Sequence, residues 1–178
     1  MLVSLPVYTL IHVALSLLGV FAGLVVVGGL MAGVRFDRWI ALFVAATVLT
    51  NVTGFGFPFV TLLPSHIVGA LSLLVLPVAI AALYWKHLAG AWRSIFVVLA
   101  VLSLYLNVFV LLAQIFQKIP VLAALAPDPK APAFALTQGL VLVLFVVLGW
   151  AAVRGFRNAP VAAPVQIPVA ALVQPTAG

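Results

Sequence analysis

Charged residues are scarce in this sequence. Of its 178 residues only 6% are charged, with 8 Lys or Arg and 2 Asp or Glu, whereas 67% are apolar. Soluble domains carry roughly 25% charged and about 45–50% apolar residues. A compact soluble protein of this size would not cover its surface with so few charges. The composition therefore excludes a soluble enzyme and indicates an integral membrane protein.

Cysteine is absent, and no acid lies within a long apolar stretch. The lack of cysteine excludes a disulfide framework, a thiolate metal site and a cysteine nucleophile. The only acids, Asp37 and Asp128, fall between the apolar stretches, whereas ion-coupled carriers usually depend on buried carboxylates. No Gly-rich phosphate loop, nucleophile elbow or HExxH pattern occurs. We therefore expect neither ion-coupled transport nor catalysis.

Five long apolar stretches make up most of the chain. Each is close to the ~20 residues that a spanning helix needs, whereas a membrane strand has only ~9–11 residues of alternating polarity. The sequence therefore predicts an all-α, five-helix transmembrane bundle over residues 1–157 and a Pro/Ala-rich tail over residues 158–178. The predicted spans are approximately residues 7–32, 39–62, 66–85, 94–116 and 134–153.

Basic residues predict the orientation of this bundle. Two of them, Lys118 and Lys130, fall on one side of the predicted spans. The other side receives six: Arg35, Arg38, Lys86, Arg93, Arg154 and Arg157. Because cytoplasmic loops carry an excess of Lys and Arg, the amino terminus is predicted outside and the carboxyl terminus in the cytoplasm. Cations scattered between apolar stretches are not a nucleic-acid footprint, so no nucleic-acid partner is expected.

The polar residues of the predicted spans gather toward the outer half of the bundle. Since the bilayer core offers no water to such groups, their position indicates a polar pocket that opens outward. The candidate ligand-binding residues are Asn51, Asn107, Gln114 and Gln138. The alternative is that these side chains only join helices through hydrogen bonds, worth ~0.6 kcal/mol each.

Two histidines suggest a cofactor. His12 and His66 lie near the same leaflet, on the first and third predicted spans. Paired histidines from different helices can ligate a b-type haem or a copper ion, so both are candidate metal ligands. The alternative is one hydrogen-bonded histidine inside the bundle and one histidine at the water boundary.

Two segments carry a resemblance. Thr53–Phe59 (TGFGFPF) and Tyr105–Pro120 (YLNVFVLLAQIFQKIP) resemble parts of small, uncharacterised polytopic proteins of the bacterial inner membrane. The resemblance covers most of the predicted spans but not the tail. It implies a helical, multi-pass protein of the bacterial inner (plasma) membrane, and it implies no activity and no site residues.

Three functions are compatible with these features. The leading hypothesis is an accessory or structural subunit of a larger membrane complex, because the loops are minimal, the tail is uncharged, and Gly19-x-x-x-Gly23 and Gly29-x-x-x-Gly33 predict close helix packing. The second is a redox module in which His12 and His66 hold a b-type haem near a quinone. The third is a small-solute pore or binder that uses the polar pocket. Membrane lipids and other membrane protein subunits are the expected partners.

Overall fold

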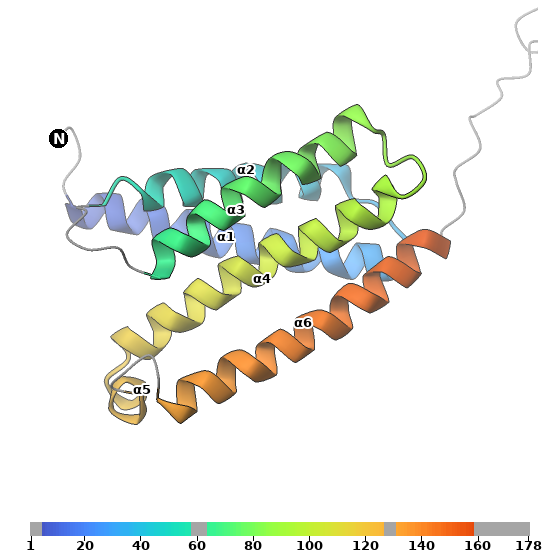
Figure 1. Ribbon diagram of the computed structural model, residues 1–178. Helices are drawn as coiled ribbons and strands as arrows, with labels where there is room; N and C mark the ends of the chain where they lie inside the picture. The colour runs from blue at the N-terminus through green and yellow to red at the C-terminus, as the bar shows by residue number, and fades with distance from the viewer. Residues whose placement is uncertain (1–4, 58–63, 127–130, 159–178) are drawn as a thin grey trace, which may run out of the picture.

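The chain forms a bundle in which successive long helices run antiparallel (Figure 1). The computed structural model describes residues 5–57, 64–126 and 131–158. Of these residues 88% are helical and none lies in a strand, so the predicted all-α class is confirmed. The elements are α1 (Leu5–Met31), α2 (Asp37–Gly54), α3 (Pro64–Ile80), the π-helix η1 (Ala81–Trp85), α4 (Trp92–Lys118), α5 (Pro120–Leu125) and α6 (Pro132–Asn158). Apart from Asn158, which ends α6, the predicted tail lies outside the described residues.

Four helical segments are long and apolar enough to cross a membrane. They are Leu5–Met31, His66–Trp85, Trp92–Lys118 and Pro132–Arg157. Each lies within a few residues of a predicted span, apart from the carboxyl end of α6, which extends further. The chain thus has the features of a multi-pass membrane protein, in agreement with the class that its composition predicts.

Helix α2 is the predicted span that does not meet this criterion. It has 18 residues, or about 27 Å at 1.5 Å per residue, and it begins with the charged pair Asp37 and Arg38. It ends at Gly54 and is followed by a turn, whereas the predicted span continues to Leu62. Residues 58–63 lie outside the described residues. The crossing of the membrane by α2 therefore stays a prediction.

Glycine and proline set several helix ends. Helix α1 ends at a Schellman motif, in which Gly33 has φ 73° and the Val34 N–H donates to the Gly29 carbonyl at 2.8 Å. Only a residue without Cβ adopts this φ at little cost. Helices α5 and α6 begin at Pro120 and Pro132, since the first position of a helix needs no N–H donor.

Helices α1 and α4 form the centre of the bundle. Helix α1 packs against α2, α4 and α6, and α4 also packs against α3 and α6. The largest fully buried apolar side chains are Phe96, Leu30, Ile40, Leu76 and Leu104. Most of the hydrophobic core lies toward the end of the bundle where α1 finishes and α2 and α4 begin. That half of the interior is apolar and combines aliphatic side chains with the rings of Phe43, Phe96 and Phe156.

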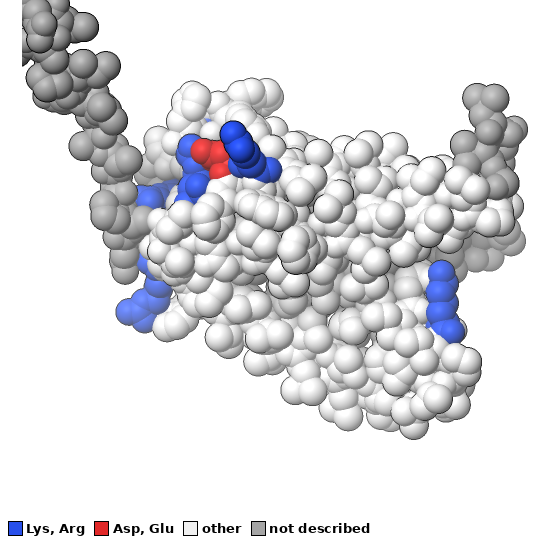
Figure 2. Space-filling model, turned by 180° about the vertical axis from the view of Figure 1, so that it is seen from behind, with Lys and Arg blue, Asp and Glu red and all other residues white. Residues whose placement is uncertain are grey.

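Basic side chains gather at the same end. The described cations there are Arg35, Arg38, Lys86, Arg93, Arg154 and Arg157. Figure 2 shows Lys and Arg concentrated at one end of the molecule and a further basic side chain near the opposite end. Arg35 forms an exposed ion pair of 2.6 Å with Asp37. We refer to this end as the basic end.

Glycines permit close helix contact, as the small-residue spacing predicts. Gly19 and Gly23 are buried in α1, and a Cβ on Gly23 would meet Leu104 of α4 at 2.6 Å. A Cβ on Gly155 of α6 would overlap the main-chain carbonyl of Met31 in α1. Close packing of this kind stabilises helix association in lipid, where no hydrophobic driving force acts between helices.

The contact between α6 and α1 predicts the effect of a single methyl group. Gly155→Ala should lower the free energy of unfolding by about 1–3 kcal/mol. The new methyl group would overlap the Met31 main chain, which cannot move aside as a flexible side chain can. Gly28→Ala is the matched control, since nothing lies within 4 Å of its Cβ position and alanine favours the helix. Unfolding by SDS titration in mixed micelles measures both, and equal midpoints for Gly155→Ala and wild type would contradict the described contact.

Candidate functional site

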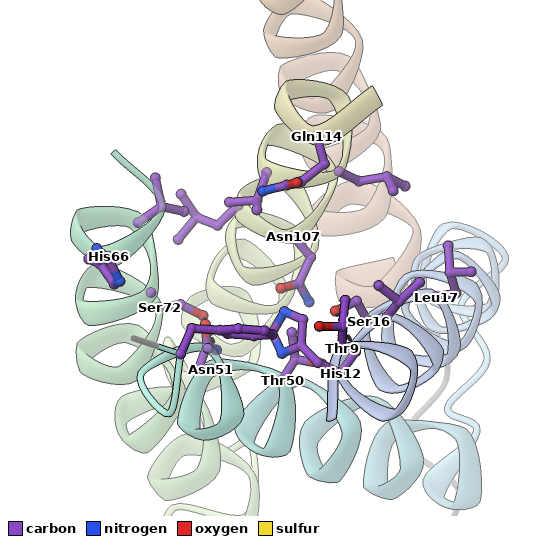
Figure 3. A pocket seen from close by; sticks show the side chains of 18 of the residues that line it. Thr9, His12, Ser16, Leu17, Thr50, Asn51, His66, Ser72, Asn107 and Gln114 are labelled. Atoms are coloured by element: carbon purple, nitrogen blue, oxygen red, sulfur yellow. Dashed lines mark hydrogen bonds between the residues drawn. The ribbon is translucent and has the colours of Figure 1, made fainter. Parts of the chain in front are cut away.

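A cavity of about 650 Å³ lies among α1, α2, α3 and α4, toward the end of the bundle opposite the basic end (Figure 3). Its position follows from its lining residues, which come from the first half of α1, the end of α2, the start of α3 and the end of α4. Most of the wall is apolar. The polar residues that line it are Thr9, His12, Ser16, Thr50, Asn51, His66, Ser72, Asn107, Gln114 and Lys118.

The cavity brings together five of the six residues that the sequence singles out. They are His12, Asn51, His66, Asn107 and Gln114. Their shared depth follows from the antiparallel helix order, which the sequence predicts. Whether they bind a ligand stays a prediction, but their meeting at one cavity is a necessary condition for it.

Gln138 is the residue that the cavity does not include. It is buried on α6, and its Nε2 donates to the Phe109 carbonyl of α4 at 3.1 Å. This bond joins two helices, as in the alternative interpretation of the polar residues. Its Oε1 is buried without a hydrogen bond to any described residue.

A buried hydrogen-bond network forms one side of the cavity. Asn51 Nδ2 donates to the Thr47 carbonyl and to Ser72 Oγ, each at 2.9 Å. Asn107 Nδ2 donates to Thr47 Oγ1 at 3.1 Å. The network thereby joins α2 to α3 and α4. Thr47 and Ser72 were not among the predicted site residues, although Thr47, Asn51 and Gly54 share a face by their spacing of four and three.

A hydrogen bond to α2 fixes the orientation of the His12 ring. Its Nδ1 lies 2.8 Å from Thr53 Oγ1, and the same hydroxyl lies 2.7 Å from the Leu49 carbonyl and 3.1 Å from the Thr50 carbonyl. In the neutral tautomer that carries its proton on Nδ1, the imidazole donates to this hydroxyl and Nε2 keeps a lone pair. This Nε2 can accept a hydrogen bond or ligate a metal.

Aromatic residues after α2 complete the wall. Tyr8 donates its hydroxyl proton to the Thr53 carbonyl at 2.6 Å, and the Phe57 ring meets the rings of Tyr8 and His12 edge-on at 5.0 and 5.2 Å. Gly56 leaves room for the tyrosine, because a Cβ there would overlap its hydroxyl. The turn of residues 55–57 is thus fixed against α1.

The two histidines stand on opposite walls of the cavity. Figure 3 shows His66 on α3, apart from His12 on α1, with Asn51 in the region between them. The His66 ring also lies 6.0 Å from the Phe55 ring. Within the described part of the chain, no group of three or more His, Cys, Asp or Glu residues forms a metal site. A metal centre here would thus rest on the two imidazoles alone.

Two polar groups in the cavity wall make no hydrogen bond to the described residues. Thr50 is only 9% exposed, and its Oγ1 makes no hydrogen bond within the described residues. The Gln114 side chain, which reaches the cavity from α4 (Figure 3), makes none with the described part of the chain either. The described lining contains the Lys118 ammonium and no carboxylate. Its electrostatics therefore suit a neutral or anionic group and not a cation.

No family model matches the sequence, and comparison with curated proteins and with solved structures finds no match. What the cavity does has to be inferred from its own geometry and chemistry. The resemblance of Thr53–Phe59 and Tyr105–Pro120 to small proteins of the bacterial inner membrane stays an expectation.

The bond between Asn51 and Ser72 predicts a measurable coupling. In a double-mutant cycle of Asn51→Ala and Ser72→Ala, the two changes should be non-additive by about 0.6 kcal/mol, the average for such bonds in membrane proteins. The control cycle combines Ser72→Ala with Gln138→Ala, whose side chains lie on helices that share no described network. Unfolding in mixed micelles gives both values, and additivity in the first cycle would count against the bond.

Proposed function

We propose that this chain is a multi-pass membrane protein that binds a small amphipathic molecule in the cavity among α1, α2, α3 and α4. One observation carries the proposal: polar groups from four helices converge on one otherwise apolar cavity. The volume of about 650 Å³ falls within the ~300–1,000 Å³ of small-molecule sites, which are mostly apolar with a few placed polar groups.

The Gln114 amide indicates the chemistry of this ligand. It is half-buried in the cavity wall, and a ligand with a hydrogen-bonding atom would satisfy it. Such a ligand carries oxygen or nitrogen atoms on an apolar body. Lys118 disfavours a cationic head. A carbonyl or hydroxyl compound that is soluble in lipid, including a quinone, fits this description.

A redox module is a second proposal, supported by the presence of both histidines on one cavity. His12 and His66 would hold a b-type haem. The bond from His12 Nδ1 to Thr53 orients this imidazole and leaves Nε2 to face such a group. Bound there, the haem would supply one-electron transfer.

The role of accessory subunit stays a prediction. Large apolar side chains are exposed along α6, among them Leu140 at 73% and Val146 at 63%. Lipid and a protein partner would cover such a face equally well. The proposal of a binding protein rests instead on the interior of the bundle.

The cavity experiment compares wild type with four variants of the full chain, Gly69→Leu, Gln114→Leu, Gly28→Leu and His12→Ala, all purified in mild detergent. Gly69→Leu places a branched side chain in the cavity wall, where a Cβ would make ordinary contact with Phe55 at 3.5 Å. Gln114→Leu removes the amide. Gly28→Leu is the control on the outer surface of α1. Organic extracts are analysed by mass spectrometry, and the visible spectrum of each sample is recorded.

Wild type and Gly28→Leu should yield the same co-purifying molecule, which Gly69→Leu should lack. Gln114→Leu should retain about two- to tenfold less, the effect of one hydrogen bond. A Soret band lost in His12→Ala would identify haem as that molecule. Identical extracts from all variants would refute the cavity as a binding site.

The orientation is a further part of the proposal. We infer an outer amino terminus and a cavity that faces the outer leaflet, in a bacterial inner membrane, because six of the seven described basic residues lie at the other end. Fluorescent-protein and alkaline-phosphatase fusions after residues 35, 65 and 158 test this. Fusions after 35 and 158 should be cytoplasmic, and those after 65 periplasmic. Equal readings at 35 and 65 would show that α2 does not cross.

A further inference from the structure

A second hollow lies on the flank of the bundle between α4 and α6. It has a volume of about 370 Å³ and is lined almost entirely by apolar side chains. Gly149 widens it, because only Val101 lies near the position of a Cβ there, at 3.4 Å. The lining residues are Val98, Val101, Leu102, Tyr105, Leu142, Phe145, Val146, Gly149, Trp150 and Val153. We name these residues the flank groove.

The flank groove opens on a surface that a bilayer would cover. Val98, Val146 and Trp150 are 51%, 63% and 61% exposed, and both helices belong to segments long and apolar enough to span a membrane. A concave apolar surface in that position is complementary to an elongated apolar group. The acyl chains of lipids are the apolar groups that surround such a surface.

Arginines continue the groove at the basic end. Arg154 and Arg157 each follow a groove residue, Trp150 and Val153, by four positions and therefore share its face of α6. The Arg154 guanidinium lies 4.7 Å from the centre of the Trp150 ring. The two cations thus stand just beyond the apolar groove, at the depth where tryptophan side chains meet lipid headgroups.

No carboxylate neutralises these arginines within the described residues. The described acid, Asp37, pairs with Arg35 at 2.6 Å. From the start of α4, Arg93 adds positive charge nearby, with its guanidinium 4.4 Å from the Phe156 ring of α6. Guanidinium groups bind phosphate oxygens in a bidentate manner, and basic pockets between membrane helices bind anionic headgroups.

We propose that the flank groove binds an anionic phospholipid, with one acyl chain in the groove and the phosphate on Arg154 and Arg157. Charge complementarity selects this occupant over a zwitterionic lipid. The flank groove shares no residue with the cavity among α1 to α4, so the proposal does not depend on the ligand of that cavity.

Native mass spectrometry of the full chain in detergent tests the headgroup. The probes are dioleoyl phosphatidylglycerol and dioleoyl phosphatidylcholine, which differ only in the head. Wild type should retain phosphatidylglycerol in preference to phosphatidylcholine. Arg154→Gln and Arg157→Gln should each lower this preference about fivefold, which corresponds to about 1 kcal/mol per basic residue near an anionic surface. The control Arg35→Gln removes an equal charge at the basic end and should leave the preference unchanged.

Gly149→Leu tests whether an acyl chain lies in the flank groove. It fills the groove and should reduce retention of both lipids, whereas Gly149→Ala, whose Cβ fits beside Val101, should not. The proposal is overturned if wild type retains both lipids equally, if Arg35→Gln acts like Arg154→Gln, or if Gly149→Leu changes nothing. A dimer in delipidated wild type that Gly149→Leu dissociates would instead assign the groove to a second copy of the chain.

Discussion

The two N–H groups of the Asn51 amide illustrate the constraint on which the rest of the bundle depends. The hydrocarbon core of a bilayer offers no partner to a polar group, so the protein must supply one. One N–H goes to the Thr47 carbonyl in α2 and the other to Ser72 in α3. Helix α2 is the most polar of the long helices by mean hydropathy. It packs between α1 and α3, where these bonds can form.

The same constraint divides the bundle into two halves. Toward the basic end the interior is apolar, and glycines such as Gly23 and Gly155 let main chain and side chains meet closely. Such packing stabilises helices in lipid, where burial of apolar surface contributes little. Toward the other end polar side chains enter the interior, and their hydrogen bonds hold the helices around a cavity. The cavity thus lies in the half of the bundle whose interior contains hydrogen-bonded polar side chains.

The sequence predicts depth in the membrane better than rotation about a helix axis. Helical rise and antiparallel order place His12, Asn107 and Gln114 at similar depth, and the structure finds them on one cavity. Gln138 has a comparable depth but faces the Phe109 carbonyl, because the rotation of α6 depends on its contacts with α1 and α4. The hydrogen bond between His12 and Thr53 depends likewise on a distance between helices, which residue spacing does not encode. The contact of Phe57, just beyond the end of α2 at Gly54, with Tyr8 of α1 is also tertiary.

Helix α4 lines both hollows but with different faces. The flank groove takes residues 98, 101, 102 and 105 of this helix, and the cavity takes residues 106, 107, 110, 111, 114, 115 and 118. At 3.6 residues per turn these two sets lie on roughly opposite sides of the helix. Without shared residues, substitutions in the two hollows should act additively. A measured departure from additivity would therefore indicate that α4 couples the two hollows.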